Sequence, residues 1–401
     1  MANRQQAVKM TDTVYWVGAI DWNSRDFHGY LTPRGTTYNA FLVMADKITL
    51  IDTVKAPFRA EMLERISSVV NPSDIAYLVS NHAEPDHSGS LPETIGAIRP
   101  EKVFASPMGV KTLRAYYGNL DLTAVKTGDT VSMGNREISF LETRMLHWPD
   151  SMFSYLPDEK VLFSSDAFGM HLASSQRFAD QIDPSILEYE GAKYFANIIL
   201  PYAALVTKLL AQVRADGLEL AMILPDHGPA WRRGSDIAGV LERYGTWAAQ
   251  PPRRKALIVY DTMWGSTDRM AQAIAEGIWS RGVEVSVKCM KANHRSDIAH
   301  ELLGCGALLA GSPTINNSLF PSMADVMCYL EGLRPKNLIG SVFGSFGWSG
   351  EAIPVLEKTL DTMGVTRIGQ TVTQQYLPGQ DTLDRCYTQG ITIAEELLKA
   401  T

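Results

Sequence analysis

The segment SNHAEPDHSGS (residues 80–90) follows an apolar run and places four ionisable side chains within six residues: His82, Glu84, Asp86 and His87. In an extended chain alternate side chains project to one side, so we expect His82, Glu84 and Asp86 to converge and His87 to follow as the chain turns. Packing four ionisable groups together costs desolvation and repulsion unless a cation compensates. The segment therefore predicts a metal site, and so many ligands from one loop indicate two metals.

Further candidate ligands follow apolar runs in the N-terminal half, where loops containing glycine or proline begin. They are His147 in MLHWPDS, Asp166 in FSSDAFG and His227 in LPDHGPA. Loops on a rigid sheet usually carry such side chains. A lone histidine after a strand is more often a hydrogen-bonded core or surface group than a ligand, and we interpret His171, His294 and His300 in that way.

A short linker divides the chain into two predicted domains, residues 1–249 and 256–401. The linker, QPPRRK (250–255), combines two prolines with three cations. Before it, strand-like runs such as ITLIDTV (48–54) mix with helical patterns such as RAEMLERISSVV (59–70). The N-terminal domain is therefore expected to contain both strands and helices.

Strands and helices alternate strictly after the linker. Strands are expected at 256–260, 283–288, 306–311 and 339–344, and helices at 270–280, near 319–332 and near 349–363. Alternation of this kind implies a parallel sheet with helices on both faces. We therefore predict a doubly wound α/β domain of about 146 residues.

Three polar loops follow the strands of the C-terminal domain. They are YDTMWGSTDRMA (260–271), GSPTINN (311–317) and GSFGWSGE (344–351). The first loop contains hydroxyl side chains and a glycine directly before the N-terminus of a helix. Such a position favours binding of a phosphate. The loop contains neither G-x-x-x-x-G-K nor G-x-G-x-x-G, which argues against a triphosphate and weakens a dinucleotide interpretation. The three loops predict one ligand site at the carboxyl ends of the strands, although tight turns in any such sheet are the simpler alternative.

Composition excludes several functional classes. With 37 basic and 44 acidic side chains the formal charge is −7, and the sequence has no Lys/Arg run, so neither nucleic acid nor an anionic membrane is the expected partner. The start of the chain has no apolar signal-peptide core, and the most apolar stretch (196–213) is interrupted by Asn197, Pro201 and Lys208, so no membrane span is expected. The four cysteines form no C-x-x-C pair, and the cytoplasm is the expected compartment.

The H-x-E-x-D-H loop is followed along the chain by His147, Asp166 and His227. With this series of residues the sequence resembles the flavodiiron proteins over essentially the whole chain. The resemblance implies a metallo-β-lactamase-like αββα sandwich followed by a flavodoxin-like domain. It places one iron between His82, Glu84 and His147, and the other between Asp86, His87 and His227, with Asp166 bridging. Some relatives leave the residue at position 87 off the metal. Zinc hydrolases of this fold typically carry histidine at position 84, and the carboxylate here favours iron.

The same resemblance implies that FMN occupies the three C-terminal loops. Its phosphate would lie against Thr262, Met263, Gly265, Ser266 and Thr267, and its ring near Pro313, Thr314, Asn316, Asn317, Phe346, Gly347 and Trp348. Trp264 and Trp348 could stack on the flavin or belong to the core. His28 and Tyr194 are candidates for hydrogen bonds to a ligand of the metals, and a core position is an equal alternative for Tyr194.

The implied reaction passes electrons from an external donor through FMN to a di-iron centre, which reduces dioxygen to water or nitric oxide to nitrous oxide. Because the chain has no C-x-x-C pair, it carries no rubredoxin module of its own, so a separate rubredoxin is the first expected donor and a reduced deazaflavin the second. The family also implies a head-to-tail homodimer. Three alternatives remain: a deazaflavin-dependent oxidase, a zinc hydrolase fused to a flavodoxin domain, and a flavodoxin-like carrier with a vestigial metal loop.

Overall fold

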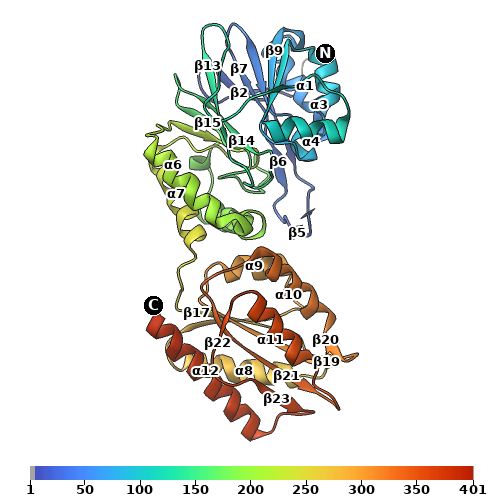
Figure 1. Cartoon of the computed structure of the whole chain (residues 1–401), viewed down its shortest axis with the longest axis vertical. Helices are drawn as coiled ribbons and strands as arrows, with labels where there is room; N and C mark the ends of the chain where they lie inside the picture. Colours follow the sequence, from blue (N-terminus) through green and yellow to red (C-terminus); the bar gives the residue numbers. More distant parts are fainter. Residues whose placement is uncertain (1–4, 401) are drawn as a thin grey trace. The chain divides into compact units, whose positions relative to one another are not determined.

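The structure is a computed structural model, and it describes residues 5–400. The chain divides into two compact units (Figure 1). The first unit extends to Gly245, apart from Gly29–Leu31 and Phe195–Pro201, which group with the second unit; the second unit begins at Thr246. The helix α7 (Gly234–Ala249) ends directly before the segment 250–255, and the strand β17 (Lys255–Tyr260) begins at the last residue of that segment.

Two β-sheets form the centre of the first unit. One contains, in spatial order, β1 (Val8–Lys9), β2 (Val14–Trp16), β7 (Phe41–Val43), β8 (Ile48–Ile51), β9 (Ile75–Ser80), β10 (Lys102–Ala105) and β11 (Thr123–Ala124). The other contains β12 (Thr130–Ser132), β13 (Glu137–Glu142), β14 (Met152–Leu156), β15 (Val161–Phe163) and β16 (Met222–Leu224). Two small pairs, β3 (Ala19–Asp21) with β6 (Thr36–Tyr38) and β4 (Asp26–Phe27) with β5 (Tyr30–Leu31), lie apart from them.

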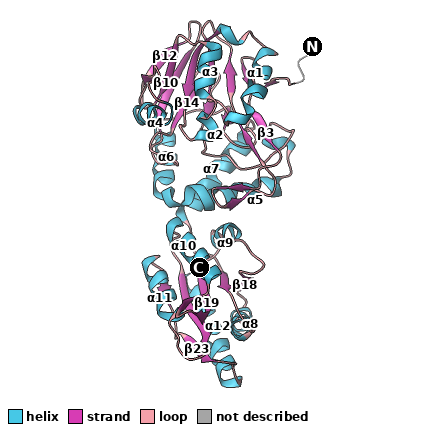
Figure 2. Ribbon diagram, turned by 90° about the vertical axis from the view of Figure 1, so that its right-hand side faces the viewer, coloured by secondary structure: helices cyan, strands magenta, loops and turns pink. Residues whose placement is uncertain are grey.

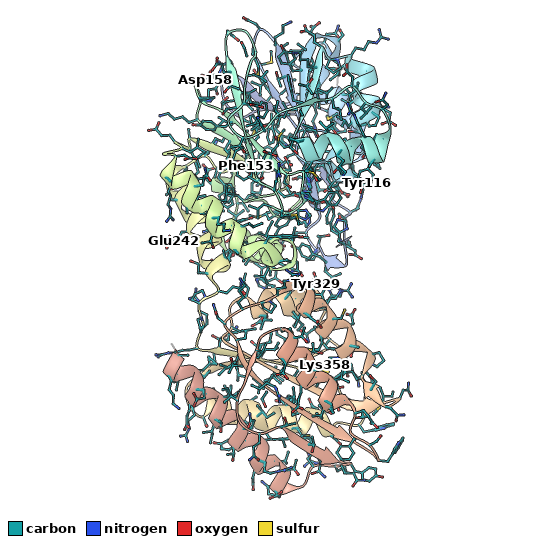
Figure 3. All side chains as sticks on the ribbon, in the orientation of Figure 1. Tyr116, Phe153, Asp158, Glu242, Tyr329 and Lys358 are labelled. Carbon is teal, nitrogen blue, oxygen red and sulfur yellow. The ribbon has the colours of Figure 1, made fainter. Side chains whose placement is uncertain are left out.

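The main core of this unit lies between the two sheets. Phe41 and Phe104 of the first sheet and Phe140 and Phe163 of the second belong to one buried cluster. Phe153 of β14 is also buried, whereas Tyr116 is half exposed (Figure 3). Burying large aromatic side chains between two sheets removes much apolar area from water, which is the main favourable term in folding.

Helices cover the outer faces of both sheets (Figures 1 and 2). On the first sheet they are α1 (Arg59–Ser67), α3 (Leu91–Ile98) and α4 (Pro107–Tyr117), whose apolar residues join a second buried cluster with that sheet. On the other side lie α5 (Pro184–Tyr194), α6 (Ala203–Ala215) and α7. This arrangement of helix, sheet, sheet and helix is the expected αββα sandwich.

One helical stretch of the first unit, Pro184–Ala215, is long and apolar enough to cross a membrane by length and composition. It includes a π-helical turn, Phe195–Ile199, and a 3₁₀ turn, Leu200–Tyr202. Half of its most apolar window is buried within the structure, as in the core helix of a globular protein. Length and composition are therefore weak evidence for a membrane span.

The second unit is a doubly wound parallel sheet. Its strands, in spatial order, are β18 (Glu284–Cys289), β17, β19 (Ala307–Ile315), β21 (Ile339–Phe346) and β22 (Thr366–Arg367), with β20 (Ser318–Leu319) paired to β19 and β23 (Val372–Gln375) to β21. All these pairs are parallel except β19 with β20. The helices are α8 (Ser266–Trp279), α9 (Arg295–Leu302), α10 (Pro321–Leu333), α11 (Ala352–Thr362) and α12 (Gln380–Ala400).

The expected alternation of strands and helices is present, and β19 and α8 are longer than the apolar runs indicated. β19 continues past residue 311, because Pro313 still pairs with Ser345 of β21. The chain then turns back, and Leu319 of β20 pairs with Thr314 of β19. α8 begins at Ser266, four residues before the expected start, because its polar first turn has no apolar period. Strand ends and helix starts therefore carry polar residues that periodicity does not detect.

The burial of the cysteines predicts how they react. Burial raises the pKa of Cys305 to about 12 and that of Cys386 to about 11, so both stay protonated and unreactive at neutral pH, whereas Cys328 is exposed. We expect a thiol reagent at pH near 8 to modify Cys328 rapidly and to reach Cys305 and Cys386 only after denaturation. Peptide mapping by mass spectrometry would show this, and fast modification of Cys305 in the folded protein would contradict the assignment.

Candidate metal centre and flavin site

The predicted metal loop leaves the carboxyl end of β9 and turns at a proline. His82 and Glu84 lie on the extended part, and Pro85 begins the one-turn helix α2 (Pro85–Ser88), since its fixed φ suits the first helical position. Asp86 and His87 therefore lie on a helical turn rather than on an extended chain. The expected convergence of Asp86 with His82 and Glu84 is therefore wrong in detail, because the chain turns into a helix at Pro85, before it reaches Asp86.

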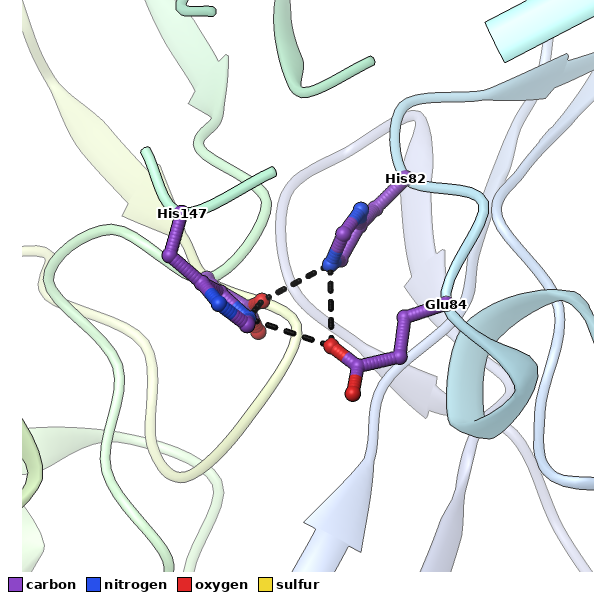
Figure 4. Close-up of side chains that lie close together, drawn as sticks. His82, Glu84 and His147 are labelled. Carbon is purple, nitrogen blue, oxygen red and sulfur yellow. Dashed lines mark hydrogen bonds and ion pairs between the residues drawn. The ribbon is translucent and has the colours of Figure 1, made fainter. Parts of the chain in front are cut away.

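The first group of candidate ligands comprises His82, Glu84, His147 and Asp166, whose ligand atoms all lie within 4.8 Å of one another. Glu84 Oε2 lies 3.2 Å from His82 Nε2 and 3.1 Å from His147 Nε2. Asp166 Oδ2 lies 3.2 Å and 3.1 Å from the same two nitrogens. Figure 4 shows His82 and Glu84 side by side, with His147 opposite them.

The second group comprises Asp86, His87 and His227. Asp86 Oδ2 lies 3.2 Å from His87 Nε2 and 3.1 Å from His227 Nε2. The other oxygen of Asp166, Oδ1, lies 3.4 Å from His87 Nε2 and 3.5 Å from His227 Nε2. The two oxygens of one carboxylate thus face two separate groups of imidazole nitrogens, and His87 points its Nε2 into the site.

Burial and charge show that these residues fit metal ions. Within the described chain, Asp86 Oδ1, Asp166 Oδ1 and His87 Nε2 are buried and take part in no hydrogen bond. Such atoms carry a large desolvation cost unless a bound ion compensates it. Imidazole nitrogens and carboxylate oxygens aimed at common points suit first-row transition metals.

The pKa values reflect the same crowding. Burial alone would lower the pKa of His147, but the carboxylates of Asp166 and Glu84 raise it to about 9. For Glu84, burial alone would raise the pKa, but hydrogen bonds from His147, His28 and His82 hold it below its usual range. The carboxylates therefore stay ionised, as metal ligands must.

Outer hydrogen bonds fix the orientation of the histidine rings. His82 Nδ1 donates to Asp150 Oδ2 at 3.0 Å, and the same oxygen accepts the Ala83 N–H at 2.6 Å. His227 Nδ1 donates to the Thr37 carbonyl at 2.6 Å. Each bond leaves Nε2 directed at the site, which is how metal-ligating histidines are usually held. Asp150 was not among the predicted residues; its position three residues after His147 was the only indication in the sequence, which does not show which histidine it contacts.

The two residues predicted around the metal site, His28 and Tyr194, both lie near it. His28 Nε2 donates to Glu84 Oε1 at 2.6 Å, and the His28 side chain is more than half exposed. Tyr194 is buried, with its ring centroid 6.1 Å from that of His227, so it belongs both to the core and to the wall of the site. Burial raises the pKa of Tyr194 well above its ordinary value.

His171 is closer to the site than a generic core histidine. Its ring centroid lies 4.6 Å from that of His227, and its Nδ1 lies 2.8 Å from the Thr36 hydroxyl. It is hydrogen-bonded, as expected, but the sequence did not place it beside a candidate ligand. His294, also expected to be hydrogen-bonded, accepts the Ser296 N–H as the N-cap of α9.

The C-terminal loops enclose a cavity of about 650 Å³ at the carboxyl ends of β17, β19 and β21. Ten of the twelve predicted flavin residues line it: Thr262, Met263, Ser266, Pro313, Thr314, Asn316, Asn317, Phe346, Gly347 and Trp348. Gly265 and Thr267 do not; Gly265 has a φ of 86° at the N-cap of α8, and Thr267 is buried with its hydroxyl 3.0 Å from that of Ser345. Volume, hydroxyls and the adjoining helix N-terminus fit a flavin mononucleotide.

Aromatic side chains form the exposed rim of this cavity. Trp264 is 89% exposed and Trp348 is 87% exposed, so neither belongs to the core. Tyr376, which the sequence analysis missed, also lines the cavity and is 62% exposed. It follows β23, a short strand without a clear apolar alternation. The rim therefore offers flat apolar surfaces for a ring ligand or a second molecule.

Comparisons with known proteins agree with the two expected domains. The model of the ODP family beta lactamase matches residues 36–228, and the flavodoxin model matches residues 258–390. A nitric oxide reductase of Moorella thermoacetica is 43% identical over 397 residues, covering 98% of this chain and 99% of the relative.

Two solved structures share the fold over nearly the whole chain. The rubredoxin oxygen:oxidoreductase of Desulfovibrio gigas is 45% identical with a TM-score of 0.97, covering 98% of this chain and 99% of its own. The flavodiiron protein of Giardia intestinalis is 33% identical with a TM-score of 0.92, covering 98% and 97%. With both domains matched in order and this degree of identity, the chain belongs to the flavodiiron proteins.

Proposed function

We propose that this chain is an oxidoreductase that uses FMN and two iron ions to reduce dioxygen to water and nitric oxide to nitrous oxide. The observation that carries the proposal is the position of Asp166, whose two oxygens face separate imidazole groups. A two-metal site needs a ligand placed in this way. Relatives named as a nitric oxide reductase and as a rubredoxin oxygen:oxidoreductase support the two gases as substrates.

The ligand assignment follows two of the three groups of potential ligands among the described residues; the third group, His87, Asp166 and Asp226, shares two members with them. His82, Glu84 and His147 would hold one iron, and Asp86, His87 and His227 the other, with Asp166 shared. Four imidazoles and three carboxylates suit iron better than an imidazole-rich zinc site does. His87 is included because its Nε2 faces Asp86 and Asp166.

The chain's own residues would hold the cofactors in place and supply protons. When bound, FMN takes up electrons from a donor and releases them singly, and a pair of ferrous ions binds a diatomic gas and reduces it. Reduction of dioxygen consumes four electrons and four protons, and reduction of two nitric oxide molecules consumes two of each. His28 holds a proton at Nε2 against Glu84 Oε1 and is partly exposed to solvent, so it can exchange protons between bulk water and the site.

Electrons would come from a separate donor, with the protein rubredoxin as the first candidate and the diffusible cofactor reduced deazaflavin as the second. The second donor would make the chain a deazaflavin-dependent oxidase of the same family. The four cysteines are free, which suits a cytoplasmic enzyme.

Metal content and gas consumption test the function together. The purified protein should contain about two iron ions and one FMN per chain. With FMN chemically reduced under anaerobic conditions, it should consume dioxygen and nitric oxide, as followed with gas electrodes. Two zinc ions without iron would support the hydrolase alternative, flavin without metal would support the vestigial carrier, and consumption of neither gas would exclude the proposed reaction.

The role of Asp166 can be tested by metal content alone. Asp166→Asn removes the charge between the two imidazole groups and leaves one amide oxygen to bind, so we expect bound iron to fall from about two to below one per chain. Asp158→Asn is the matched control, because Asp158 lies in the turn between β14 and β15 with its side chain about half exposed, and its ion pair is with Arg136. Iron would be counted by mass spectrometry after gel filtration, and a full complement in Asp166→Asn would contradict the assignment.

We also propose a head-to-tail homodimer in which one subunit's flavin faces the other's irons. The family resemblance and the exposed aromatic rim of the flavin cavity support it. Trp348→Glu should shift the species observed by analytical ultracentrifugation from dimer toward monomer and lower turnover with an external donor. A wild-type monomer with full turnover would contradict the dimer.

A further inference from the structure

A buried carboxylate, Asp261, lies at the start of the loop expected to hold the flavin phosphate. It follows the last residue of β17 and is 1% exposed. The proposed function assigns it no role, and it does not line the cavity. A charged group this deeply buried needs compensating partners.

The two oxygens of Asp261 join the phosphate loop to a neighbouring helix. Oδ1 accepts the Thr262 N–H at 2.6 Å, and Oδ2 accepts the Ser322 hydroxyl, in the first turn of α10, at 2.5 Å. Thr262 Oγ1 in turn accepts the Gly265 N–H at 3.0 Å. These bonds fix the beginning of the loop before any ligand arrives, so they reduce the entropy that binding would otherwise cost.

The charge of Asp261 has the opposite effect on a phosphate. Among the described residues, those lining the cavity include no lysine or arginine, so a phosphate there would be held by hydroxyls, backbone N–H groups and the N-terminus of α8. Lys291 Nζ lies 4.0 Å from Asp261 Oδ1, and the Lys291 side chain is half exposed. A poorly compensated carboxylate beside a phosphate weakens its binding.

We propose that Asp261 is a positioning residue of the flavin site that shapes the phosphate loop through its hydrogen bonds while its charge restrains affinity for the phosphate. This inference rests on the proposed binding of FMN. Asparagine could keep both contacts, accepting from Thr262 N–H and donating to Ser322 Oγ, without the charge. The two effects can therefore be separated by substitution.

The test compares FMN with riboflavin, which lacks the phosphate, by quenching of flavin fluorescence on the whole flavin-free chain. Asp261→Asn should bind FMN about three- to tenfold more tightly than the wild type and riboflavin within about twofold of it, because only the phosphate feels the lost charge. Asp261→Ala, which also loses both hydrogen bonds, should bind FMN about tenfold more weakly than Asp261→Asn. Ser322→Ala keeps the charge and should weaken FMN binding about threefold.

Glu276→Gln is the matched control, since it removes one charge from an exposed position near the far end of α8 and should leave both dissociation constants within about twofold. The proposal is overturned if Asp261→Asn binds FMN no more tightly than the wild type, or if riboflavin gains as much as FMN. If the wild type binds neither flavin, the proposed FMN site itself fails. Riboflavin binding by Asp261→Asn also shows that the variant has folded.

Discussion

The N-terminal unit is organised around one buried carboxylate, that of Asp166, which is surrounded by the six other candidate ligands, five of them buried. Asp166 follows β15, and its two oxygens lie within 3.5 Å of imidazole nitrogens on two sides. Without ions the cluster is costly, because several of its buried atoms lack hydrogen bonds. The two sheets bring the ends of β9, β15 and β16 to one place, so that the ligands meet there. Hydrogen bonds around the site, such as that from His82 to Asp150, fix the orientation of the imidazole rings.

The sequence predicts the local chemistry of this site better than its geometry. The crowding of His82, Glu84, Asp86 and His87 already required a cation, and the αββα fold followed from the resemblance. The partition of the loop between two groups could not be predicted from alternation alone, because Pro85 begins a helical turn after Glu84. Residues that surround the ligands, such as Asp150 and His171, depend on which segments of the chain meet in three dimensions. No spacing in the sequence reveals this.

The C-terminal unit shows the same division between pattern and detail. Apolar periodicity predicted the parallel sheet and the three loops at its carboxyl edge, and the loops do enclose one cavity. Periodicity did not predict Tyr376, or the carboxylate of Asp261 that ties the first loop to α10. Both are set by contacts between segments far apart in the sequence. Each unit thus places its candidate cofactor where several strands end, as open sheets usually do.

We propose that Asp166 holds two iron ions between the two groups of ligands. A crystal structure of the iron-loaded protein, with anomalous diffraction measured at the iron edge, tests it most directly. We expect two iron peaks about 3.5–4 Å apart, one beside His82, Glu84 and His147 and one beside Asp86, His87 and His227, with one Asp166 oxygen bound to each. A single peak, or two peaks with Asp166 bound to only one of them, would contradict it.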